Sequence, residues 1–241
     1  MTHPSQSLER AKSYLNLQLT RTPQSDAFHP PEEGPYVTIS REAGAGAPEF
    51  AQSLADHLNA GDRDSEVQWT VFDQKIVEHV LQDQNLSPTL ARFLPEDRIP
   101  HIISSLGEII GLHPNLWTLV QRTNAFMREL ARRGHVILVG RGANFATAGI
   151  RGGVHCRLVA PEHHRACRVS AEQNIDLEEA HSVIRRIDSA RRHYVRSVFD
   201  TDVADPTAYD IVINTARVPF SQSIEVIARL VEHARATAAA R

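Results

Sequence analysis

The turn at residues 40–49 combines residue types that can bind phosphate. It reads Ser-Arg-Glu-Ala-Gly-Ala-Gly-Ala-Pro-Glu and follows a short apolar run. Glycines let backbone amides curl around an anion, and a helix beginning at Pro48 would add its positive dipole end. A complete phosphate-binding loop also has a lysine and a hydroxyl residue, whereas Ala47, Pro48 and Glu49 stand here. The turn therefore fits either a degenerate phosphate cradle or an ordinary strand-to-helix connection.

A second candidate is Arg141, in the segment Val-Gly-Arg-Gly after the most apolar strand pattern, HVILVG. In open parallel sheets ligands bind at the carboxyl ends of the strands. Arg141 is therefore expected in the same crevice as the first turn, although a surface arginine in a glycine-containing loop explains the pattern equally well.

A third candidate is a series of arginines between residues 165 and 196, with Asp188 among them. Helical spacing places Arg165 with Arg168 on one face, and Asp188 with Arg191 on another. A helical hairpin carrying them could close over a transferring phosphoryl group, because that reaction depends on positioned positive charge and excluded water. The competing interpretation is a solvated helix face with internal ion pairs.

Other chemistries lack support. The 13 histidines show no metal-ligand spacing, no G-x-S-x-G motif is present, and the two cysteines form no C-x-x-C pair. With 26 Lys plus Arg against 29 Asp plus Glu, the formal charge of −3 argues against a nucleic acid polymer as partner. The low cysteine content, and the absence of a signal peptide or long apolar span, predict a soluble cytoplasmic protein with no membrane attachment.

The hydrophobic pattern predicts five strands separated by helices, at residues 36–40, 69–72, 136–139, 154–159 and 211–213. Such an order indicates an α/β fold, with a five-stranded parallel sheet between two helical layers. A short helix over 7–19 and a Pro-rich linker over 20–35 precede a globular domain expected to span 36–241. The long interval between strands two and three predicts a helical insertion over about 74–134.

Residues 36 to about 232 resemble the cytidylate kinase-like family, a divergent branch of the P-loop nucleoside monophosphate kinases. The resemblance rests on the order and spacing of several short segments. They are VTIS with Ser40-Arg41-Glu42 and Gly44-Ala45-Gly46, Phe72-Asp73-Gln74-Lys75, Val139-Gly140-Arg141-Gly142-Ala143, Ala160-Pro161 with Arg165 and Arg168, Asp188 with Arg191 and Tyr194, Asp205-Pro206, Tyr209-Asp210 and Asn214-Thr215.

The resemblance implies transfer of the ATP γ-phosphoryl group to a nucleoside monophosphate, by analogy CMP or dCMP, with Mg²⁺ accompanying ATP. It also implies a helical substrate-binding insertion and a lid over about 161–200. The residues that would bind the ATP phosphates are Ser40, Arg41, Gly44, Ala45, Gly46 and Ala47, with Arg41 standing in for the absent lysine. Asp73 and Arg141 would face the acceptor, and no metal ligand is assigned. Arg165, Arg168, Arg185 and Arg191 would close over the transferring group, with Asp188 orienting one of them.

The first loop departs from the family pattern S-R-E-x-G-[SA]-G-G. Ala47 replaces a glycine, and Pro48 removes an amide donor. The alternative hypothesis is therefore a nucleotide-binding regulatory module without turnover, in which residues 1–35 tether a protein partner. A phosphotransferase for a different small acceptor is a third hypothesis.

Overall fold

The computed structural model describes residues 4–21, 34–62, 66–77, 114–140 and 142–239. Arg141 and most of the predicted insertion, residues 78–113, lie outside the described residues. Among the described helices, none has both the length and the apolar character needed to cross a membrane.

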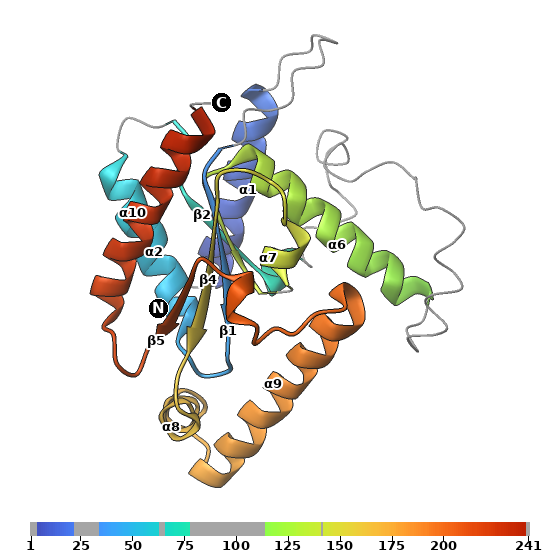
Figure 1. Cartoon of the computed structure of the whole chain (residues 1–241), viewed down its shortest axis with the longest axis vertical. Coiled ribbons are helices and arrows are strands. Elements are labelled where there is room, and N and C mark those ends of the chain that lie inside the picture. Colours follow the sequence, from blue (N-terminus) through green and yellow to red (C-terminus); the bar gives the residue numbers. More distant parts are fainter. Residues whose placement is uncertain (1–3, 22–33, 63–65, 78–113, 141, 240–241) are drawn as a thin grey trace.

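The centre of the fold is a five-stranded parallel sheet (Figure 1). Its strands are β1 (Tyr36–Arg41), β2 (Thr70–Asp73), β3 (Val136–Val139), β4 (Gly153–Val159) and β5 (Ile211–Asn214), in the order β2-β3-β1-β4-β5. Every pairing is parallel. The predicted five-stranded parallel sheet is confirmed. The two strands β1 and β3 are buried along most or all of their length, as central parallel strands require.

Helices cover both faces of this sheet. The described helices are α1 (Pro4–Arg21), α2 (Ala47–Gly61), α6 (Pro114–Arg133), α7 (Ala143–Ala146), α8 (Glu162–Gln173), α9 (Leu177–Phe199) and α10 (Phe220–Ala239), with a 3₁₀ turn, η1, at Pro206–Ala208. The predicted three-layer α/β/α class is therefore confirmed.

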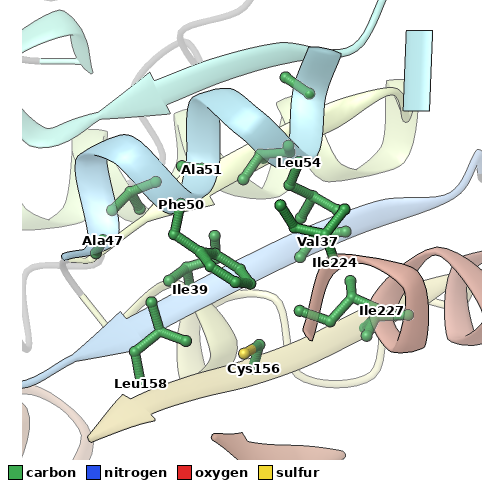
Figure 2. Close-up of a cluster of buried hydrophobic side chains, with 14 of the residues drawn as sticks. Val37, Ile39, Ala47, Phe50, Ala51, Leu54, Cys156, Leu158, Ile224 and Ile227 are labelled. Atoms are coloured by element: carbon green, nitrogen blue, oxygen red, sulfur yellow. The ribbon is translucent and has the colours of Figure 1, made fainter. Parts of the chain in front are cut away.

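One face of the sheet packs against α2 and α10 (Figure 2). Alternate strand residues supply this core, since successive side chains of a strand point to opposite faces. Phe50 and Leu54 of α2 and Ile227 of α10 meet Val37 and Ile39 of β1. This packing fixes where α2 begins, and therefore where the β1–α2 loop lies.

The opposite face packs against α1, α6 and α7. Leu15 of α1 and Leu130 of α6 are fully buried there, in one cluster with Phe72 and Tyr36. The core therefore includes residues ahead of Tyr36, where the sequence pattern places the domain boundary. Helix α6, within the predicted insertion, is a covering helix of the sheet.

Helices α8 and α9 form a hairpin beyond the carboxyl ends of β1 and β4 (Figure 1). Its own core joins Ala166 and Val169 of α8 to Ala180 and Ile184 of α9, and also includes Ala43 of the β1–α2 loop. The hairpin is therefore packed directly on the loop that carries the predicted phosphate-binding residues.

Candidate functional site

The β1–α2 loop has the backbone form of an anion cradle. Gly44 and Gly46 have positive φ angles of 76° and 83°, a conformation that glycine adopts without steric cost. Gly46 is the N-cap of α2 and supplies no side-chain cap. Among the described residues, the amides of Gly44, Gly46 and Ala47 meet no hydrogen-bond acceptor. These amides and the dipole of α2 together form a site suited to phosphate.

Arg168 of α8 lies against this loop. A Cβ atom on Gly46 would stand 2.7 Å from Arg168 Nη1 and 2.7 Å from Phe220 Cζ. The Arg168 guanidinium also forms an ion pair with Glu49 at 3.2 Å and lies 5.5 Å from the centre of the Phe220 ring. A cation is thus already placed beside the unused amides, held by a carboxylate in the first turn of α2.

Arg165 holds the hairpin to the loop and to the end of β4. It is buried, and its Nε donates to the carbonyl of Ala160 at 2.9 Å, while Nη1 donates to the carbonyl of Ala43 at 2.9 Å. It also pairs with Asp188 at 2.7 Å and with Glu42 at 3.3 Å. The guanidinium of Arg165 is therefore committed to protein acceptors.

A cavity of about 390 Å³ opens between the ends of the strands and α9. Four arginines and two carboxylates line it, and both carboxylates, Glu42 and Asp188, are the partners of Arg165. The positive charges therefore dominate, and the cavity suits an anionic ligand. Its charged lining residues are Arg41, Glu42, Arg157, Asp188, Arg191 and Arg192, and its other lining residues include Ser40, Gln74, Gly140, Ile187, Tyr194 and Val203.

Arg157 of β4 lies at this cavity and is 7% exposed. Its Nη1 donates to Ser40 Oγ at 2.9 Å, and its guanidinium carbon lies 5.7 Å from the centre of the Tyr209 ring. Tyr209 is also buried, and its hydroxyl lies 2.8 Å from the Val203 carbonyl oxygen and 3.2 Å from Ser40 Oγ. Within the described part of the chain, Arg157 forms no ion pair.

Arg191 of α9 faces the same cavity. Burial lowers the pKa of Arg191, the Asp188 carboxylate opposes that effect, and the positive charges of Arg157 and Arg165 lower it further. Arginine stays charged in proteins. Burial is the main cause of this pKa shift, and the contributions of Arg157 and Arg165 show that their positive charges lie close to Arg191.

The structure brings some of the predicted site residues together at the cavity and leaves others apart. Ser40, Arg41, Asp188 and Arg191 line it. Arg185 is largely exposed and pairs with Glu162 at 3.2 Å. Asp73 accepts a hydrogen bond from the amide of Ile76 at 2.9 Å and so caps the start of the helical residues that follow β2. Arg141 lies outside the described residues.

Arg157 was missed by the sequence reasoning. The available signal was a charged residue within an otherwise apolar parallel strand, where charged side chains are rare unless paired.

No group of three His, Cys, Asp or Glu residues that could hold a metal ion occurs in the described ranges.

Comparison with known proteins identifies relatives of this chain. A family model described as the cytidylate kinase-like family matches residues 36–217. A cytidylate kinase of Methanothermobacter thermautotrophicus is 37% identical over 187 residues, covering 75% of this chain and 95% of that protein. A cytidylate kinase of Methanopyrus kandleri is 24% identical over 199 residues, covering 79% of this chain and 90% of that protein.

The fold is also found in an uncharacterized protein from Eubacterium ventriosum. The two superpose with a TM-score of 0.60 at 18% sequence identity, over 82% of this chain and 98% of the other. The order of the motifs from the β1–α2 loop to β5, the parallel sheet and the extent of the family match all agree, and the chain belongs to the cytidylate kinase-like family.

Proposed function

We propose that this protein is a nucleoside monophosphate kinase that transfers the γ-phosphoryl group of ATP to CMP or dCMP. The observation that carries the proposal is the arginine-rich cavity at the strand ends, directly beside a loop with unused backbone amides. Two adjoining anion sites are what a transfer between two phosphorylated ligands requires. The choice of acceptor is supported by the relatives named cytidylate kinase.

The donor phosphates would bind at the β1–α2 loop. The amides of Gly44, Gly46 and Ala47 would hold them, and Arg168 would move from Glu49 onto the incoming anion. Mg²⁺ would enter with ATP and balance part of the phosphate charge.

The acceptor would bind in the cavity, where Arg41 and Arg191 would face its phosphate. Because Arg41 lines this cavity, we assign it to the acceptor in place of the ATP contact that the sequence predicts. Arg141 and Asp73 are further acceptor contacts by family analogy. Asp188 forms an ion pair with Arg191 at 3.7 Å and accepts a hydrogen bond from the Ala43 amide at 2.7 Å. It would therefore position both the β1–α2 loop and the arginine that lines the cavity. Transfer then proceeds by positioning and by neutralising charge on the moving phosphoryl group, with the α8–α9 hairpin excluding water as the lid.

One observation favours the regulatory alternative. Arg168, next to the unused amides, is occupied by Glu49, and Pro48 supplies no amide donor at the start of α2. A loop arranged in this way could bind nucleotide without turning it over.

The deciding experiment is phosphorus NMR of the purified protein with ATP, Mg²⁺ and each of CMP, dCMP, UMP, AMP and GMP. We expect selective appearance of CDP or dCDP. Arg191→Met should reduce that turnover at least tenfold, whereas Arg229→Met, which changes an exposed arginine on α10, should leave it unchanged. No diphosphate from any acceptor, in protein that still binds ATP, would overturn the kinase proposal and support the regulatory module.

A further inference from the structure

We infer that Arg157 is a phosphate-binding residue for the acceptor nucleotide, held in position by Ser40 and Tyr209. The identity of the anion as an acceptor phosphate rests on the proposed function, whereas the anion site itself rests on the contacts of Arg157.

The first step is the burial of an uncompensated charge. Arg157 is 7% exposed, and in the described ranges its contacts are with neutral groups, the Ser40 hydroxyl and the Tyr209 ring. A buried charge is costly unless an opposite charge accompanies it. Arginine cannot escape that cost by losing its proton. The missing partner of Arg157 is therefore an anion that the protein binds.

The second step is that the cavity carboxylates are committed elsewhere. Asp188 and Glu42 both pair with Arg165, and Asp188 also faces Arg191. Arg157 is close enough to Arg191 for its charge to lower the pKa of that residue. Two neighbouring guanidinium groups at one cavity wall fit a dianionic phosphate.

The third step assigns Arg157 to the acceptor and not to ATP. Ser40 and Arg157 stand in register on β1 and β4, and their neighbours Ile39, Cys156 and Leu158 point into the core beneath α2 and α10 (Figure 2). Arg157 therefore projects from the sheet face opposite to that core. The cavity is lined by Ser40, Arg41 and Glu42 but by none of residues 43–47, whose amides form the donor cradle.

The fourth step is that Arg157 is held in place while donors remain available. Within the described part of the chain Arg157 donates to Ser40 Oγ, and Tyr209 contacts both Arg157 and Ser40. A guanidinium has five N–H donors in a planar fork. A bidentate contact with phosphate is thus compatible with the contact to Ser40.

The test is calorimetric titration of wild type, Arg157→Met and Arg157→Lys with CMP, with cytidine and with ATP. We expect Arg157→Met to weaken CMP binding about 10- to 150-fold, the range for loss of hydrogen bonds to a charged group. Cytidine and ATP should bind as before, because neither reaches Arg157 with a phosphate. Arg157→Lys should give an intermediate loss, since it keeps the charge but not the fork, and Arg229→Met is the matched control.

Thermal melting separates this role from a structural one. Because Arg157→Met removes a buried unpaired charge, the ligand-free variant should melt no lower than wild type. Equal weakening of CMP, cytidine and ATP binding, with or without a fall in Tm, would assign Arg157 a structural role and overturn the inference. If the methionine variant does not fold, the CMP and cytidine affinities of Arg157→Lys decide instead.

The inference can also be separated from the proposed function. If wild type neither phosphorylates nor binds any nucleoside monophosphate, the proposed kinase function is refuted. Inorganic phosphate then becomes the probe of the anion site. If phosphate raises the Tm of wild type but not that of Arg157→Met, the anion site is supported. If phosphate raises the Tm of both proteins equally, or of neither, the anion site is refuted. If wild type phosphorylates CMP and Arg157→Met does so at the same rate, the inference is refuted while the proposed function stands.

Discussion

Arg165→Met is expected to destabilise the protein severely, because the sequence places this residue in catalysis while the structure gives it four protein partners. The substitution removes donors from the carbonyls of Ala43 and Ala160 and leaves Glu42 and Asp188 without their main cation. Breaking a buried ion pair by removing one member costs about 3 to 5 kcal/mol. For a chain of this size that loss lowers Tm by about 6 to 20 °C.

The matched control is Arg185→Met on the same hairpin. Its pair with Glu162 is solvent-exposed, and such pairs contribute about 0 to 1 kcal/mol, equivalent to at most about 4 °C. Both variants would be followed by circular dichroism during thermal unfolding and by urea titration. If Arg165→Met melts within 4 °C of wild type, or no lower than Arg185→Met, the assignment of Arg165 as a structural connection is refuted.

Three further predictions concern the loop and the thiols. Glu49→Gln should tighten ATP binding about two- to fivefold in a calorimetric titration, because it removes a negative charge beside the phosphate site and releases the α8 guanidinium; weaker binding would contradict this. Gly46→Ala should lower the free energy of unfolding by at least about 1 kcal/mol more than Gly149→Ala, since both have positive φ but Gly149 faces open space; urea titration compares them. Burial raises the pKa of Cys156 to about 12, so at pH 8 a thiol reagent should modify exposed Cys167 and reach Cys156 only after unfolding.

The sheet was predictable because each strand carries a local signal. Runs such as VTIS and HVILV are short, β-branched and bounded by glycine or polar residues, and parallel strands are buried on both faces. The N-terminal helix was predicted too, but its apolar stripe did not reveal what it covers. Tyr14 packs its ring against Phe72 across more than fifty residues of sequence, and no local pattern encodes that pairing.

The candidate site was predictable only in outline. Arg165 and Arg191 look equivalent in the sequence, and what separates them is the approach of Glu42, which stands more than a hundred residues earlier than both. Helical spacing did predict that Asp188 lies near Arg191, because that contact is local. Arg157 was overlooked because a single arginine in a strand has no spacing partner.

The packing of α1 and α10 limits how far the protein can be shortened. The family match covers residues 36–217 and so excludes both helices, yet Leu15 of α1 and Ile227 of α10 are each fully buried, on opposite faces of the sheet. A recombinant fragment cut at the family boundaries would expose apolar surface on both faces at once and should aggregate on expression. Comparative biochemistry on this protein therefore requires both flanking helices, even though neither belongs to the segment that defines its relatives.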